Sequence, residues 1–195
     1  RIELTLERMA NGEVPAFTRD FVLADVVLDP AYPRRFSEYS GDLSGRVIGA
    51  LALAPGAETA GVNLEDLVKD ALSYQREDGR FGDAALTYTA DAIVMEHMAL
   101  LWGNGRMLVG LLEYYSVKQD PAVLDASRKL GDFLLATREA CSSADVAERI
   151  KDFGAAGIIC FTQLIEGLVM LADATGDAKY LDASEQIVPW LEARG

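Results

Sequence analysis

The sequence predicts an all-α fold, an α/α toroid of the six-hairpin type in which about three helical hairpins form a partial ring. Two observations support this prediction. The segment LDASRKLGDFLLA at Leu124 returns 57 residues later as LDASEQIVPWLEA at Leu181. Within each unit, an apolar helix that contains glycine precedes an amphipathic helix. This is the pattern expected for the buried inner helix and the partly exposed outer helix of a toroid. No segment is predicted as a strand, since LTYTADAIV begins strand-like but lengthens into a helical pattern.

The hairpins are predicted at about Gly45–Gln75, Gly105–Arg138 and Thr162–Arg194. In the first, GRVIGALALA is the inner helix, PGAETAGVN the linker and LEDLVKDALSYQRE the outer helix. In the second, GRMLVGLLEYY parallels that inner helix. Glycine destabilises a helix interior, so the glycines of the inner helices indicate close helix packing. These glycines are Gly49, Gly110 and Gly167.

The turns of the second and third hairpins carry helix start signals. Asp120 and Asp177 stand where N-caps are expected, and Pro121 falls at a first helical position. Each outer helix has a single apolar stripe. Pro189 lies on the opposite face of its helix, where we expect at most a kink.

Length and charge restrict the class of protein. The 195 residues are predicted to form one domain, 1–195, and three hairpins fit a fragment or N-terminal half of a longer toroid. The net charge of −13 argues against nucleic-acid partners and anionic membrane surfaces. The longest apolar stretch, Ala155–Leu171, is short for a membrane span and contains Gln163 and Glu166. A cytoplasmic location is slightly favoured, and no oligomeric state is predicted.

Metal and thiol chemistry have little support within the chain. Two cysteines, Cys141 and Cys160, and a single histidine do not make a zinc site, so no cofactor is predicted for this chain. Cys160 lies in the apolar run AAGIICF, which favours a buried thiol.

The segments before the inner helices are rich in acids, aromatics, arginines and amides, a composition typical of sugar-binding pockets. Glu38 and Asp42 are candidate paired carboxylates, although Asp42 alternatively caps the first inner helix. Arg46 and Arg106 begin inner helices and would clamp a substrate, or else form structural ion pairs. We therefore predict a substrate-binding set, with catalytic residues unassigned: Glu38, Tyr39, Asp42, Arg46, His97, Trp102, Asn104, Arg106, Gln163 and Glu166.

The remaining candidates also have structural alternatives. His97 is a substrate ligand or acid/base, or a half-buried histidine with satisfied hydrogen bonds. Trp102 is a stacking platform or a core aromatic. Gln163 and Glu166 face the cavity, or form a polar pair between helices. GRFG and GNG are interpreted as turns, because the lysine and preceding strand of a phosphate loop are absent.

Four segments resemble the N-terminal part of the catalytic toroid of glycoside hydrolase family 127, the β-L-arabinofuranosidase-like proteins. They are FSEYSGDLSGRVIGALAL, YQREDGRFG, LLWGNGRMLVGLLEYY and TQLIEGLVMLADATGDAKYLDAS. The resemblance covers most of the chain from about Phe36 and implies a carbohydrate partner. It also implies a cysteine nucleophile held near zinc by further cysteines and a glutamate, all later in the full-length protein. Cys141 and Cys160 do not match that cluster, and the role is not transferred to them.

The resulting expectation is a carbohydrate-active protein, a glycoside hydrolase whose cysteine and zinc part lies outside this chain. Two alternatives remain open. A non-catalytic helical-repeat module would expose apolar and basic patches to a protein partner. A sugar epimerase or isomerase of the same architecture would need a histidine pair for proton transfer, and this chain has one histidine.

Overall fold

The computed structural model describes residues 2–11, 17–31, 38–56 and 63–192, and within them every regular element is a helix. The helices are α1 (Ile2–Asn11), α2 (Arg19–Val27), α3 (Asp42–Leu53), α4 (Leu64–Leu72), α5 (Met95–Lys118), α6 (Pro121–Cys141), α7 (Ala144–Asp152), α8 (Gly154–Thr162), α9 (Leu164–Thr175), α10 (Ala178–Ile187) and α11 (Pro189–Glu192). The all-α prediction is therefore confirmed.

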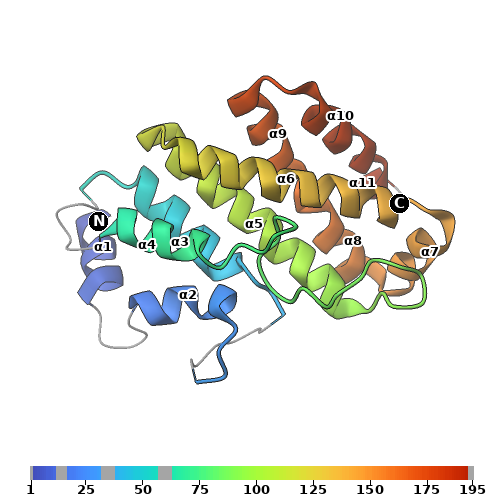
Figure 1. Cartoon of the computed structure of the whole chain (residues 1–195), viewed down its shortest axis with the longest axis horizontal. Helices are drawn as coiled ribbons and strands as arrows, with labels where there is room; N and C mark the ends of the chain where they lie inside the picture. Colours follow the sequence, from blue (N-terminus) through green and yellow to red (C-terminus); the bar gives the residue numbers. More distant parts are fainter. Residues whose placement is uncertain (1, 12–16, 32–37, 57–62, 193–195) are drawn as a thin grey trace.

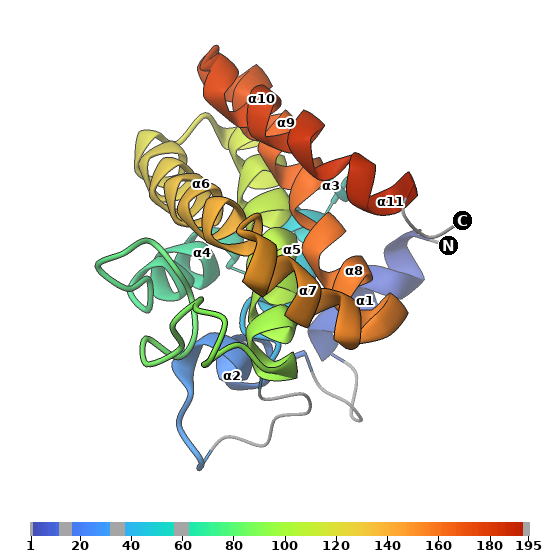
Figure 2. The same cartoon turned by 90° about the vertical axis from the view of Figure 1, so that its right-hand side faces the viewer.

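Three hairpins form the arc of an α/α toroid: α3 with α4, α5 with α6, and α9 with α10 (Figure 1). The inner helices pack side by side, α3 against α5 and α5 against α9. The outer helices α6 and α10 contact each other, and α6 also packs on α9. Figure 2 shows α5 at the centre, with α4 and α6 on one side and α8 on the other. This arrangement confirms the predicted division into inner and outer helices.

Glycine sets the distance between the inner helices. A Cβ added to Gly45 would lie 2.5 Å from the carbonyl oxygen of Arg106, and one on Gly110 would collide with the main chain of Gly45. On the other side of α5, a Cβ on Gly167 would lie 2.9 Å from the Leu108 side chain. Larger residues at these positions would push the helices apart, so the predicted role of glycine in close packing is confirmed.

The predicted caps of the outer helices are also present. Asp120 accepts a hydrogen bond from the Ala122 amide at 2.9 Å, and Asp177 accepts one from the Lys179 amide at 3.1 Å. Pro121 occupies the first position of α6. Pro189 begins the short helix α11 after α10 has ended at Ile187. The helix is therefore interrupted before Pro189, where the sequence predicted at most a kink.

Three boundaries differ from the prediction. Helix α3 begins at Asp42, and α5 begins at Met95, so the GNG motif lies inside a helix rather than in a turn. The segment before the third inner helix, expected as a loop, contains α7 and α8. At the GNG motif burial explains the difference, since neighbouring segments cover these residues and tertiary packing outweighs local propensity. Residues 34–37, the linker residues 57–62 and the predicted hairpin end at Arg194 lie outside the described part of the chain.

One helical stretch, Gly154–Thr175, has the length and the mean hydropathy, 1.8, of a helix that can cross a membrane. Core helices of globular proteins can have the same length and composition. About two fifths of the stretch, 39%, is buried here, where α8 and α9 pack on α5. The expected absence of a membrane partner stays a prediction.

Candidate functional site

Polar and aromatic side chains gather along one face of the inner helices, which we call the Trp102 face. Residues 102, 106 and 113 share one side of α5 because they are spaced by four and seven positions. A hydrogen bond joins Trp102 to Asp42 at the start of α3, and an ion pair joins Arg106 to Glu166 of α9. Glu113 interacts electrostatically with Glu166. The face consists of Tyr39, Asp42, Arg46, Trp102, Arg106, Glu113 and Glu166.

Asp42 is the centre of the first half of this face. Its Oδ1 accepts hydrogen bonds from the Trp102 indole N–H at 2.9 Å and from Arg46 Nε at 2.8 Å. The Tyr39 ring meets the Trp102 ring edge-on, with centroids 6.4 Å apart. Burial raises the pKa of the Tyr39 hydroxyl, so it remains protonated at neutral pH. The indole is thus fixed from two sides while remaining partly exposed.

The second half of the face contains an ion pair and a further carboxylate. Arg106 of α5 donates to Glu166 of α9. Burial, together with the negative charge of Glu166, raises the pKa of Glu113, and the charge of Arg106 opposes that rise. Sequence reasoning missed Glu113, although its spacing of seven residues from Arg106 places it on the same side of the helix. The pairing of Arg46 and of Arg106 agrees with the ion-pair alternative, and a clamping role for them stays a prediction.

The N-terminus of α3 is capped by a residue that the sequence analysis did not identify. The N-cap position belongs to Gly41, so the prediction that Asp42 caps the helix is wrong. Instead Asp25, a 4% exposed residue of α2, accepts hydrogen bonds from the amides of Gly41, Leu43 and Ser44 at 2.9–3.2 Å. This frees the Asp42 carboxylate to hold Trp102. A single acid within the apolar run FVLADVVL was the available signal.

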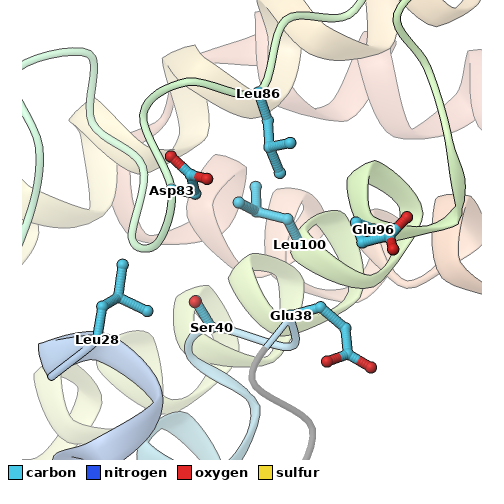
Figure 3. Close-up of a pocket in the computed structure, with 7 residues that line it drawn as sticks. All are labelled: Leu28, Glu38, Ser40, Asp83, Leu86, Glu96 and Leu100. Atoms are coloured by element: carbon cyan, nitrogen blue, oxygen red, sulfur yellow. The ribbon is translucent and has the colours of Figure 1, made fainter. Parts of the chain in front are cut away.

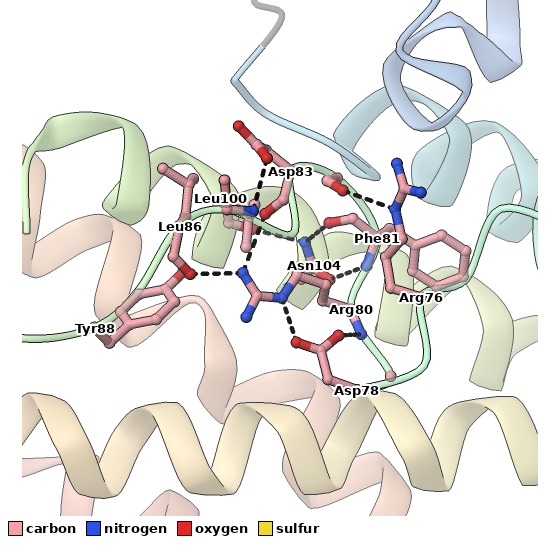
Figure 4. A network of polar contacts seen from close by, with 12 residues as sticks. Arg76, Asp78, Arg80, Phe81, Asp83, Leu86, Tyr88, Leu100 and Asn104 are labelled. Atoms are coloured by element: carbon pink, nitrogen blue, oxygen red, sulfur yellow. Dashed lines mark hydrogen bonds and ion pairs between the residues drawn. The ribbon is translucent and has the colours of Figure 1, made fainter.

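Asn104 connects three segments rather than facing an open cavity. It is fully buried, its Oδ1 accepts from the Phe81 amide, and its Nδ2 donates to the carbonyls of Phe81, Leu100 and Ser40 (Figure 4). The flanking glycines of the GNG motif allow the backbone of residues 39–40 and of Gln163 to approach α5 closely. Asn104 therefore holds the segment before α3 and the loop at Phe81 on α5.

Arg80 stabilises the same loop from the other side. It is 9% exposed, pairs with Asp78 at 2.6 Å and donates to the carbonyls of Asp83 and Leu86 (Figure 4). Its guanidinium also lies 4.7 Å from the centre of the Phe133 ring. These contacts fix the loop that carries Asp83 and Leu86.

His97 is buried, with 3% of its surface exposed. Its Nδ1 accepts from the Val94 amide, which leaves Nε2 to donate to the Thr87 carbonyl 3.1 Å away. Burial lowers the pKa of the imidazole, so the neutral form is favoured. This geometry agrees with the alternative of a satisfied, buried histidine, and we do not include His97 or Asn104 in the proposed ligand surface.

A separate pocket of about 510 Å³ opens beside the start of α3 (Figure 3). It is lined by Leu28, Glu38, Ser40, Asp83, Leu86, Glu96 and Leu100. The segment 38–42 separates it from the Trp102 face, since Glu38 and Ser40 line the pocket while Tyr39 and Asp42 belong to the face. Glu38 is the one sequence-predicted candidate in this lining.

The remaining candidates do not form a metal site. Gln163 is half-buried directly before α9, and its main chain packs near Gly105. Cys141 and Cys160 are buried free thiols, and burial raises their pKa values to about 12 and about 11. Both are therefore protonated at neutral pH and unsuited to nucleophilic attack. Within the described residues, no group of three or more His, Cys, Asp or Glu side chains is arranged to hold a metal ion.

Comparison with protein-family models identifies the type of domain. The model described as β-L-arabinofuranosidase, GH127 catalytic domain, matches residues 48–191, well over half of the chain. The matched region contains Trp102, Arg106 and Glu166 and begins within α3, so Tyr39, Asp42 and Arg46 precede it. Searches of curated proteins and of solved structures gave no match.

Proposed function

Because the chain belongs to the GH127 β-L-arabinofuranosidase catalytic-domain family, we propose that its Trp102 face binds the furanoside substrate of a glycoside hydrolase. Membership supports a carbohydrate-active protein of the glycoside hydrolase type. The β-L-arabinofuranoside as substrate and the Trp102 face as its binding surface are our proposals.

The observation that carries the proposal is the fixed, partly exposed Trp102 beside alternating acids and arginines. An indole ring offers an apolar face to the C–H groups of a sugar. Carboxylates of Asp42 and Glu166 accept hydrogen bonds from sugar hydroxyls, and the arginines donate to ring or hydroxyl oxygens. Because Asp42 already holds the indole, the ring and its neighbouring acceptor are positioned before the ligand arrives.

The same geometry argues against the two alternatives. A protein-binding module would present apolar and basic patches, whereas this face combines acids, arginines and aromatics. An epimerase would need two groups for proton transfer, and the single histidine is buried with both ring nitrogens engaged. Sugar binding therefore explains more of the face than either alternative does.

We assign binding and orientation, not bond cleavage, to the described residues. A zinc-held cysteine does not fit them, because Cys141 and Cys160 are protonated, buried thiols without nearby metal ligands. We propose that a hydrolytic cysteine and any zinc belong to parts of the protein outside this chain.

Titration calorimetry with methyl β-L-arabinofuranoside tests the proposal. Trp102→Ala should weaken binding about tenfold or more, because losing ~1.4 kcal/mol of ring contact changes the affinity by that factor. Tyr115→Ala is the matched control, since it removes a half-buried aromatic from another side of α5 and should leave the affinity unchanged. The proposal fails if the wild-type chain binds no furanoside, or if both variants bind equally well.

A further inference from the structure

The first turn of α5 is capped by a side chain whose charge changes near neutral pH. The amide of Val94, the residue before the helix, donates to Nδ1 of His97 at 3.2 Å, and the His97 amide donates to the Val94 carbonyl at 3.1 Å. In the common capping box, a glutamate or glutamine at this third helical position accepts the hydrogen bond. An imidazole can do so only while it is neutral.

The other ring nitrogen of His97 holds the segment that leads into the helix, residues 87–94, which we call the latch segment. Nε2 donates to the Thr87 carbonyl at 3.1 Å, and the Tyr88 hydroxyl donates to the His97 carbonyl at the same distance. The Tyr88 ring meets the imidazole edge-on, with centroids 5.2 Å apart. One side chain therefore fastens both ends of the latch segment, Thr87 through Nε2 and Val94 through Nδ1.

The latch segment has few other contacts that keep it closed. None of residues 87–94 belongs to a helix, and Thr87, Thr89 and Asp91 are exposed. Ile93 is the one deeply buried residue among them, with 1% exposed, and its amide donates to the Thr89 carbonyl at 3.0 Å. Segments with few buried apolar contacts open at the lowest cost in free energy, so the two contacts of the His97 ring are a large part of what closes this one.

Protonation of His97 undoes the contact at Val94. An imidazolium carries a proton on both nitrogens, so Nδ1 becomes a donor that faces the N–H of Val94. The new positive charge also lies at the N-terminus of α5, where the helix dipole disfavours it. Because His97 is 3% exposed in the closed state, water does not solvate that charge until the latch segment moves away.

The ionisable groups around the ring do not compensate for this. Glu96 of α5 is exposed and favours the imidazolium, whereas Arg80 of the preceding loop opposes it. Tyr88, and Cys141 of α6 near it, remain neutral because burial raises their pKa values. Burial of the ring is the largest influence, and it lowers the pKa of His97 while the latch segment is closed.

We propose that His97 is an acid-sensitive latch, whose protonation releases residues 87–94 and uncaps the first turn of α5 while the rest of the fold stays closed. Arg80 holds the carbonyls of Asp83 and Leu86 without help from His97, so the opening should end at residue 86 (Figure 4). Glu96 lines the pocket and lies in the uncapped turn, so the switch changes that rim of the pocket. Sugar binding by the Trp102 face plays no part in it.

Amide hydrogen exchange of the 195-residue chain, followed by nuclear magnetic resonance across the titration range of histidine, tests the latch. In the open state the imidazole regains its ordinary pKa of 6.5, so the opening constant should rise by up to about tenfold for each pH unit below that value. The protection factors of the Ile93, Val94 and His97 amides should fall by the same factor. The Phe81 amide, which donates to Asn104, should keep its protection.

Three substitutions separate a latch from a merely structural histidine. His97→Gln keeps an acceptor for Val94 and a donor for Thr87 but does not titrate, so protection of residues 87–94 should become independent of pH. His97→Ala loses both contacts and should leave these residues poorly protected at every pH. Asp91→Asn is the control, because it removes the carboxylate of the latch segment itself and should keep the wild-type pH dependence.

Three results would overturn the latch. The first is wild-type protection of residues 87–94 that does not change below pH 6.5. The second is an equal fall in His97→Gln, which would assign the effect to another group. The third is loss of protection at Phe81 together with Ile93, which would show general unfolding in place of a local opening. Since no ligand is used, each result is independent of whether the Trp102 face binds a furanoside.

Discussion

Replacing Asp25 by alanine should destabilise the chain more than any other single carboxylate substitution proposed here. The Asp25 carboxylate is 4% exposed and accepts three amide hydrogen bonds at the first turn of α3. Hydrogen bonds to a charged group contribute about 1.5–3 kcal/mol each, but these three share one oxygen. The favourable interaction with the helix dipole adds about 0.3–1 kcal/mol. We therefore expect a loss of about 3–5 kcal/mol in the free energy of unfolding.

Urea unfolding followed by far-ultraviolet circular dichroism measures this loss. Asp25→Asn retains an oxygen acceptor without the charge, so it should cost less, about 1–2 kcal/mol. Asp20→Ala is the matched control on α2, because its side chain is 59% exposed and pairs with the exposed Arg19; it should cost under about 0.5 kcal/mol. If Asp25→Ala unfolds within about 1 kcal/mol of the wild type, the capping argument is wrong.

Three further predictions use the same unfolding assay. Asn104→Ala removes four hydrogen bonds inside the core and should cost about 3 kcal/mol, and an unchanged urea midpoint would contradict its connecting role. Gly45→Ala places a methyl group 2.5 Å from the Arg106 carbonyl and should cost about 2 kcal/mol, whereas a neutral effect would show that α3 and α5 can separate freely. The pKa of His97 is lowered by burial, so the unfolded chain takes up the proton first, and stability is full above pH 6.5 and falls as the pH drops below it. His97→Gln should show a weaker loss over that range, and equal losses would assign the pH dependence to other groups.

The features that the sequence predicted correctly depend on nearby residues. Asp120 and Asp177 cap helices through amides two positions away, and Gly110 recurs with the repeat. The sequence predicted six of the seven residues of the Trp102 face. It did so because the segments before the inner helices are polar, and because the inner helices of a toroid line the same cavity. The structure brings these six together, although their contact with a sugar remains to be tested.

The features that were predicted wrongly depend on residues distant in the chain. The interpretation of Asp42 as a cap failed because Asp25, from another helix, supplies the acceptor. For His97 the sequence left two interpretations open, and the contacts of its two ring nitrogens with Val94 and Thr87 agree with the structural one. Glu113 was missed although its spacing from Arg106 places it on the same side of α5, because the sequence does not show that Glu166 of α9 approaches it. The Asp25 cap and the approach of Glu166 both depend on which segments fold against α3 and α5. Local sequence patterns do not contain that information.

The GNG motif shows how a violation of local propensity marks a junction between packed segments. Two glycines and an asparagine inside a helix cost about 2–3 kcal/mol relative to alanine, so α5 would not contain them on local grounds. Their cost is offset because Gly103 and Gly105 allow the backbones of residues 39–40 and of Gln163 to approach, and Asn104 binds the main chain of Ser40 and of Phe81. Those backbones carry Tyr39 and Ser40, which lie on opposite sides of the segment between the Trp102 face and the pocket. The motif therefore positions the segment that borders both the Trp102 face and the pocket, and a substitution within it should disturb sugar binding on that face.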